Sequence, residues 1–184
     1  NKLSHTICST ETSTILFTAD PDPSASKYEF YVGGILEKSS NVSRTFELPR
    51  LSVTDGLAVS VRVYNGSPFN CYDEDEVIVR INDIQAGTIT GTQSVCQTST
   101  NTILLNTLTS GTINGAPAVN GDYQWQYSTD NTNWSDIGLN ANNASYIIPF
   151  NSTNPTRFYR RLVNGTLLGV SCAAPTASVK ITVA

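Results

Sequence analysis

The sequence predicts an all-β protein made of two tandem antiparallel β-sandwiches. Three observations support this class: short stretches in which apolar and polar residues alternate, turn signals between those stretches, and an internal repeat. At 184 residues the chain is long enough for two cores of roughly 90 to 100 residues each. We therefore expect two modules rather than one domain.

The alternation has a period of two, which is typical of strands with one buried face. It is visible in residues 28–32, 59–63 and 123–127. Pairs that favour tight hairpin turns separate such stretches, at Asp55-Gly56, Asn65-Gly66, Asn120-Gly121 and Asn164-Gly165. No stretch shows a helical period. Short strands with turns at this spacing predict immunoglobulin-like sandwiches.

The internal repeat becomes visible when Cys96 is placed on Cys8. Six positions then match without a gap: Cys8, Thr10, Thr12, Thr14, Ile15 and Leu16 correspond to Cys96, Thr98, Thr100, Thr102, Ile103 and Leu104. Further anchors follow in order, including Tyr28-Glu29-Phe30 with Tyr123-Gln124-Trp125 and Arg62 with Arg161. The repeat predicts modules at 1–83 and 84–184. The junction is short and poor in Gly and Ser, so we expect a restricted angle between them.

The four cysteines predict disulfides. They fall two per half, no Cys-x-x-Cys spacing occurs, and the chain has a single histidine, so zinc ligation is disfavoured. The predicted bonds join Cys8 to Cys71 and Cys96 to Cys172, each at one end of its sandwich. Free buried thiols are the alternative. Disulfides imply an oxidising compartment and therefore export.

Composition and charge exclude several classes of function. A net charge of −4 with eleven scattered Lys and Arg residues disfavours nucleic acid and anionic membrane as partners. No apolar run approaches the ~20 residues that span a bilayer, and a start at Asn1 without a signal segment predicts a monomeric fragment of a longer exported protein. His5 has no nucleophile motif beside it, so we expect no enzyme and no cofactor.

Two aromatic residues are the candidate ligand-binding site. Tyr127 and Trp134 lie around the predicted hairpin of residues 128–135, where an exposed pair of rings forms a platform for stacking sugars. The alternative is that Trp134 packs on its own sheet. Trp125 is expected in the core, because such sandwiches bury a tryptophan on their third strand.

Two further motifs allow a binding or a structural interpretation. Arg160 and Arg161 are consecutive on a strand, so one of them points inward: matching to Val61 selects Arg160, and an inward Tyr159 selects Arg161. We expect the inward one to lie along Trp125. The acidic runs at Asp20-x-Asp22 and Asp73-Glu74-Asp75-Glu76 offer oxygen ligands for calcium, although a charged strand that blocks edge pairing is the simpler interpretation.

The segment Tyr123-Gln124-Trp125-Gln126-Tyr127-Ser128-Thr129-Asp130-Asn131-Thr132-Asn133-Trp134, followed by Phe158-Tyr159-Arg160-Arg161, resembles the immunoglobulin-like repeats of giant Bacteroidetes cell-surface proteins. Among these are the SprB-type gliding-motility adhesins. The resemblance implies export by type IX secretion and display on the cell surface. It also implies an adhesive filament whose partners are neighbouring repeats, surface glycans or abiotic surfaces. The alternative function is a carbohydrate-binding or spacer region of a secreted glycan-degrading enzyme.

Overall fold

The computed structural model describes residues 3–66, 71–96, 102–138, 141–149 and 156–183. Within these ranges the regular structure is β-strand, apart from one short 3-10 helix at Arg50–Ser52, which confirms the all-β class. The chain divides into two compact units, Asn1–Ile81 and Asn82–Ala184. This boundary lies two residues before the one expected from the repeat. No helix in the described ranges is long and apolar enough to cross a membrane.

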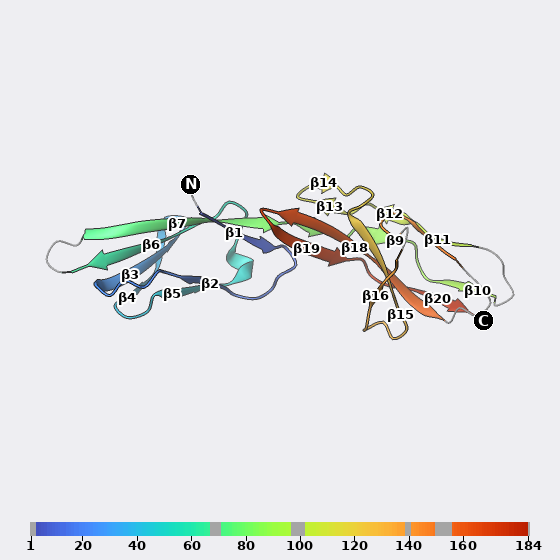
Figure 1. Ribbon diagram of the computed structural model, residues 1–184, viewed down its shortest axis with the longest axis horizontal. Helices are drawn as coiled ribbons and strands as arrows, with labels where there is room; N and C mark the ends of the chain where they lie inside the picture. The colour runs from blue at the N-terminus through green and yellow to red at the C-terminus, as the bar shows by residue number, and fades with distance from the viewer. Residues whose placement is uncertain (1–2, 67–70, 97–101, 139–140, 150–155, 184) are drawn as a thin grey trace. The chain divides into compact units, whose positions relative to one another are not determined.

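The first module packs one sheet against a second, smaller one (Figure 1). Its strands are β1 (Leu3–Cys8), β2 (Ile15–Thr18), β3 (Ala25–Val32), β4 (Ile35–Ser40), β5 (Thr45–Leu48), β6 (Ala58–Asn65) and β7 (Cys71–Asn82). The larger sheet has the order β1-β7-β6-β3-β4, and β2 pairs with β5. Phe30 of β3 stacks on Phe46 of β5 with ring centroids 5.6 Å apart. The core therefore lies between the two sheets.

The second module follows a related plan with shorter and more numerous strands. They are β8 (Ile84–Gln85), β9 (Thr88–Ile89), β10 (Gln93–Val95), β11 (Ile103–Leu105), β12 (Thr107–Thr109), β13 (Thr112–Ile113), β14 (Ala116–Pro117), β15 (Tyr123–Ser128), β16 (Ser135–Asp136), β17 (Tyr146–Ile148), β18 (Arg157–Leu167), β19 (Val170–Pro175) and β20 (Val179–Val183). The main sheet has the order β10-β20-β18-β15-β16, with β19 also on β18. Trp125 is fully buried, as expected, and packs among the residues that β11, β17 and β20 contribute.

One predicted turn is wrong. Asn164-Gly165 lies inside β18, and the chain reverses instead at Leu168 and Gly169, which have φ angles of 48° and 82°. Gly165 is required by packing rather than by a turn. A Cβ added there would lie 2.5 Å from Cδ1 of Ile84 and 2.8 Å from Cγ2 of Ile113, closer than such atoms approach. The sequence marked Gly165 as a special position, but the reason for the glycine is the close packing of Ile84 and Ile113 from other strands.

The predicted disulfide pairs are also wrong. Cys8 and Cys172 are disulfide-bonded, whereas Cys71 and Cys96 are exposed free thiols. In the first module, β1 ends at Cys8 and β7 begins at Cys71, and the two neighbouring strands point the same way (Figure 1). These cysteines therefore lie toward opposite ends of the sheet.

The second module separates its cysteines in the same manner. Cys96 directly follows Val95, the partner of Val183 at the end of β20, whereas Cys172 is opposite Gly165 of β18. Because Ile181 of β20 is opposite Arg157, the two cysteines are at least eight β18 residues apart, or roughly 26 Å at ~3.3 Å per residue. A disulfide needs a Cα separation below about 7 Å. Sequence spacing therefore assigned two cysteines to each module correctly, but it did not show that these two lie toward opposite ends of a sheet.

Candidate functional site

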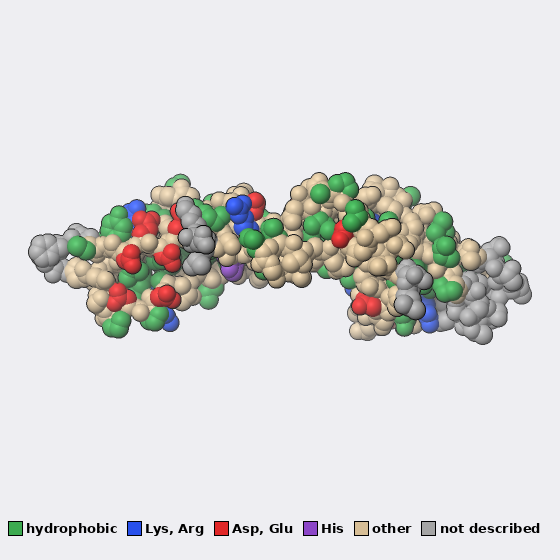
Figure 2. Space-filling view, turned by 45° about the horizontal axis from the view of Figure 1, so that its top comes forward, with side chains coloured by type: hydrophobic (Ala, Val, Ile, Leu, Met, Phe, Trp, Pro, Cys, Tyr) green, Lys and Arg blue, Asp and Glu red, His purple; other side chains and the backbone are tan. Residues whose placement is uncertain are grey.

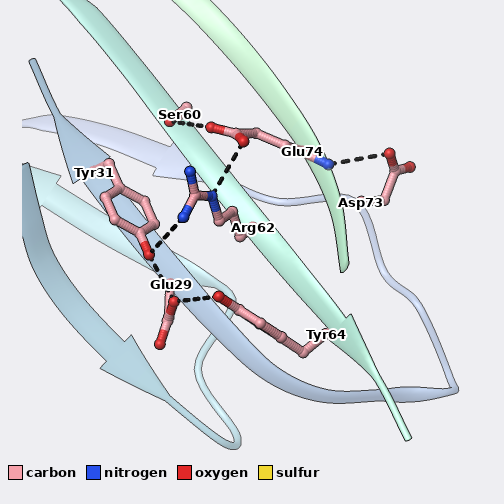
Figure 3. A network of polar contacts seen from close by, with 7 residues as sticks. All are labelled: Glu29, Tyr31, Ser60, Arg62, Tyr64, Asp73 and Glu74. Carbon is pink, nitrogen blue, oxygen red and sulfur yellow. Dashed lines mark hydrogen bonds and ion pairs between the residues drawn. The ribbon is translucent and has the colours of Figure 1, made fainter. Parts of the chain in front are cut away.

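The outer face of the first module's main sheet carries a cluster of tyrosine and charged side chains (Figure 3). Phe30 lies opposite Val61, and both point into the core, so the residues that alternate with them point away from it. We call the cluster the tyrosine face. Its members, from β3, β6 and β7, are Lys27, Glu29, Tyr31, Ser60, Arg62, Tyr64, Tyr72 and Glu74.

Glu29 is the centre of the tyrosine face. Its carboxylate pairs with Nζ of Lys27 at 2.8 Å and accepts hydrogen bonds of 2.7 Å from the hydroxyls of Tyr31 and Tyr64. These contacts, with that of Lys27 the largest, lower the pKa of Glu29 to about 2. The same hydrogen bond to Glu29 raises the pKa of Tyr64 to about 12. Glu29 is therefore ionised, and Tyr64 protonated, at all physiological pH values.

Arg62 lies between two tyrosine rings of the same face. Its guanidinium carbon is 4.5 Å from the ring centroid of Tyr31 and 4.8 Å from that of Tyr72. Its Nε donates to Oε2 of Glu74 at 3.1 Å, and this contact raises the pKa of Arg62 above its usual value. Nη1 donates to the Tyr31 hydroxyl at 3.3 Å. Arg62 thus joins the Glu29 centre to β7, and the side chains form one connected network.

The rings of this network remain accessible at its border. Tyr72 is 49% exposed, and its ring centroid lies 5.3 Å from that of Tyr64. Lys27 lies over the Tyr64 ring, with Nζ 3.9 Å from the ring centroid. None of the residues of this cluster was among the binding residues predicted from the sequence, apart from the acidic run that contains Glu74. The alternation in residues 27–31 and 60–64 was the signal, because it places these polar and tyrosine side chains on the face opposite the core.

The two acidic runs of the sequence meet at one pocket of the first module, with a volume of about 580 Å³. Asp20 and Asp22 line it from the segment after β2, and Asp73 and Asp75 from β7. Val61 and Val63 contribute apolar side chains to its lining. Within the described ranges, no group of three or more His, Cys, Asp or Glu side chains is arranged to hold a metal ion.

The second module has a different arrangement on the corresponding face. Arg160 of β18 lies over the ring of Trp134, with its guanidinium carbon 4.2 Å from the ring centroid. Its Nε donates to Oε1 of Gln126 at 2.8 Å, and Nε2 of Gln126 donates to Asp136 at 2.7 Å. One face of Trp134 is thus covered by a side chain of its own module.

The turn that carries Trp134 is shaped by Asp130. Its Oδ1 accepts the backbone N–H groups of Thr132 and Asn133 at 2.8 Å and the hydroxyl of Ser128 at 2.9 Å. These hydrogen bonds, with those of Asn133 the largest, lower the pKa of the Asp130 carboxyl well below its usual value. The polar part of the motif before Trp134 therefore has a local structural role: it closes the hairpin between β15 and β16.

The predicted pairing of Tyr127 with Trp134 does not form. Tyr127 follows Trp125 on the inward side of β15 and packs against the core, with the Arg157 guanidinium 4.6 Å from its ring centroid. Trp134 contacts Arg160, which belongs to the outer side of the same sheet. The two rings lie on opposite faces, so they do not make one platform for a sugar ring.

Arg161 is the inward member of the arginine pair, and its side chain is fully buried. Its guanidinium carbon lies 4.5 Å from the Tyr123 ring centroid and 6.0 Å from that of Trp125. In the part of the chain that the structure describes, its hydrogen-bond acceptors are uncharged: the Thr107 hydroxyl and the carbonyls of Ala86, Thr109 and Ala144. Burial lowers its pKa, but an arginine keeps its proton. Arg161 therefore connects strands and loops inside the second module.

Net charge differs between the modules. Residues 1–81 contain seven Lys and Arg and eleven Asp and Glu, whereas residues 82–184 contain four of each. Figure 2 shows acidic side chains gathered over the first module on the face in view. The whole net charge of −4 therefore belongs to the first module.

Comparisons with known proteins address family and fold. Residues 85–184 match the family described as Domain of unknown function (DUF8696). No curated protein sequence matches the chain. Three N-terminal domains of the bacteriophage RB49 Highly Immunogenic Outer Capsid protein (Hoc) superpose with a TM-score of 0.57 at 11% identity, over 97% of this chain and 67% of that one. Fibronectin(III)-like modules of Clostridium thermocellum CbhA superpose with a TM-score of 0.48 at 14% identity, over 99% and 90%. The strand order and the superposition on the Hoc domains together confirm the fold class of tandem immunoglobulin-like sandwiches.

Proposed function

We propose that this chain, which belongs to the DUF8696 family through residues 85–184, is a non-catalytic pair of extracellular modules that make adhesive contacts for a larger surface protein. The observation that carries the proposal is the tandem arrangement. Two sandwiches of related plan follow each other with a single residue, Asp83, between the last strand of one and the first strand of the next. Repeated modules of this kind extend a chain and multiply weak contacts.

Export is supported by the bonded cysteines. Cys8 and Cys172 are disulfide-bonded, and such bonds persist in oxidising compartments. The Hoc protein, which shares the fold, is by its name an outer capsid protein, so this architecture serves at an exposed surface in at least one case. In its finer form, the proposal is that the parent is a SprB-type adhesin of Bacteroidetes, exported by type IX secretion and active in gliding or attachment.

The proposal is tested at the surface of the cells that produce the parent protein. An antibody raised against the 184-residue chain should label intact cells, and brief protease treatment of those cells should remove the label. Beads coated with the chain should attach to the surfaces that the cells colonise. Labelling only after cells are permeabilised would refute export. Surface labelling without bead attachment would refute adhesion and indicate that the modules act only as a spacer.

The second candidate function is carbohydrate binding by the outer face of the second module. Trp134, Arg160, Gln126 and Asp136 combine a ring with hydrogen-bonding groups, which is the chemistry a sugar requires. Arg160 must leave the ring, or the sugar must use its other face. A glycan array probed with the chain tests this, with Trp134→Ala expected to abolish binding. Tyr127→Phe is the matched control, because Tyr127 faces the core and should leave glycan binding unchanged.

A further inference from the structure

We infer that the tyrosine face of the first module is a docking surface for a partner protein with a lysine- and arginine-rich surface. The inference rests on the proposed function, in which the modules contact a partner, and it names the surface and the partner's chemistry. Three tyrosines and one arginine lie together on an outer sheet face, and Tyr72 is 49% exposed. Tyrosine and arginine are enriched in the centres of protein interfaces and at binding hot spots.

The fold itself does not require these side chains, as the second module shows. The register places Gln124, Gln126, Leu162 and Asn164 where the first module has Glu29, Tyr31, Arg62 and Tyr64. The same sheet therefore forms without the tyrosine network. Since the network lies opposite the core, its role is to be sought at the surface.

The network is also ordered before any partner arrives. The Tyr31 and Tyr64 hydroxyls both donate to Glu29, and Arg62 is held by Glu74 and by the Tyr31 hydroxyl. Tyrosine has few rotatable bonds, and hydrogen bonds fix these rings further. Binding then costs little side-chain entropy. A prearranged aromatic surface of this kind suits a folded partner.

Charge decides which partner fits. The two cations of the tyrosine face, Lys27 and Arg62, are each paired with a carboxylate of the same face. On the same outward side of β7, Glu76 lies opposite Ser60 and adds a third carboxylate next to this face, and the module as a whole has a net charge of −4. A basic partner surface is complementary, whereas phosphate-rich polymers and anionic membranes are repelled. A face of about eight residues is smaller than a standard interface, so we expect weak binding that gains strength from repetition.

The test measures binding of the full 184-residue chain to two basic proteins, lysozyme and cytochrome c, and to the acidic α-lactalbumin. Biolayer interferometry at physiological ionic strength is suitable, because distant charges are then screened beyond ~8 Å. We expect saturable binding to the basic proteins and none to α-lactalbumin. The decisive variant is Tyr31→Gln/Arg62→Leu/Tyr64→Asn, which installs the second module's residues and should weaken binding at least tenfold.

This variant separates docking from general attraction because it makes the chain more negative by one charge. Non-specific attraction would bind a basic protein as well or better, and that outcome would overturn the inference. Absence of binding to both basic proteins would overturn it as well. Tyr72→Ala, outside the Glu29 centre, should also weaken binding and guards against misfolding of the triple variant. Gln126→Ala on the second module should leave binding unchanged.

Failure of the inference is distinguishable from failure of the proposed function. If beads coated with the triple variant attach to surfaces as well as the unaltered chain does, adhesion stands and the tyrosine face is not its site. If basic proteins bind the tyrosine face but the parent protein is found only inside cells, docking stands and the surface function falls. Anionic vesicles and a glycan array serve as further probes. If the unaltered chain binds either of them and the triple variant does not, that ligand is the partner of the tyrosine face and the inference of a basic protein partner is overturned.

Discussion

Arg62 and Arg161 occupy the same position in the sequence repeat, yet they lie on opposite faces of their sheets. Arg62 is outside, between two tyrosine rings and paired with Glu74, while Arg161 is fully buried and hydrogen-bonds uncharged oxygens. The strand register explains the difference. Val61 lies opposite Phe30, and Arg161 lies opposite Trp125, so Arg161 corresponds to Val61 in space. A shift of one residue moves a side chain to the other face.

The comparison teaches that the two modules use related strands for different purposes. The first has a largely apolar core, and a network of tyrosine and charged side chains lies on the outer face of its main sheet. The second places an arginine inside, where it hydrogen-bonds segments around residues 86, 107 to 109 and 144, and its outer face is simpler. Many of its strands have only two or three residues, so a central donor replaces part of the hydrogen bonding that long strands supply.

The largest expected difference between the modules is the loss of stability on removing the arginine of each, Arg161 or Arg62. Arg161→Ala should destabilise the second module by about 3 to 5 kcal/mol, since it leaves buried carbonyls without donors and a cavity beside Tyr123. Arg62→Ala should have a much smaller effect, because ion pairs that remain in contact with solvent contribute little to stability. Urea unfolding followed by tryptophan fluorescence, which reports on the second module, and by far-UV circular dichroism measures both. Equal losses of stability would contradict the placement of Arg161 in the interior and of Arg62 on the surface.

The second-largest expected difference is in acid sensitivity: a fall in pH should destabilise the first module through Glu29, which has no titrating counterpart in the second. The folded-state pKa of Glu29 is lowered from 4.5 to about 2, so its stabilisation is complete above the unfolded pKa and is lost as pH falls through about 2. The loss amounts to roughly 2 to 3 kcal/mol for the first module. Gln124 holds the corresponding position in the second module and does not titrate. Thermal unfolding between pH 5 and pH 2, in steps of about half a unit, follows the change.

The matched variant for this experiment is Glu29→Gln. It should be less stable at neutral pH, and the first module should lose less stability than the unaltered chain as the pH falls below 4.5. An unchanged acid dependence in this variant would assign the effect to other carboxylates.

A smaller difference is expected between the two aromatic residues of the predicted platform. Tyr127→Ala should destabilise the second module by about 2 kcal/mol, because the ring packs against the core. Trp134→Ala should cost less than about 1 kcal/mol, because its ring rests on Arg160 at the surface. Differential scanning calorimetry ranks the two, and the reverse order would place Trp134 in the core.

The smallest expected effect concerns the free cysteines. Cys71→Ser and Cys96→Ser should leave the unfolding midpoint unchanged, because both thiols are exposed. Iodoacetamide without reductant should add two labels to the folded chain, at these two positions, as read by peptide mass spectrometry. No label at all would restore the predicted pairing, in which all four cysteines are bonded, whereas a label at Cys8 or Cys172 would contradict the disulfide of the structure.

Local pattern in the sequence determined the class of each element and the existence of two modules. Alternation placed Tyr28, Phe30, Tyr123 and Trp125 in the interiors, and it also placed Glu29 and Tyr31 outside, although their common site was not foreseen. These results follow because a strand's side chains alternate between faces whatever its neighbours are.

Register and strand direction belong to the tertiary structure alone. They decided that Arg161 rather than Arg160 is buried, that Tyr127 and Trp134 face apart, and that the cysteines of each half lie at opposite ends of a sheet. They also brought residues 29, 62 and 74 together from three strands. Each of these facts depends on which residue lies opposite which, and that pairing is fixed by packing between strands far apart in the chain.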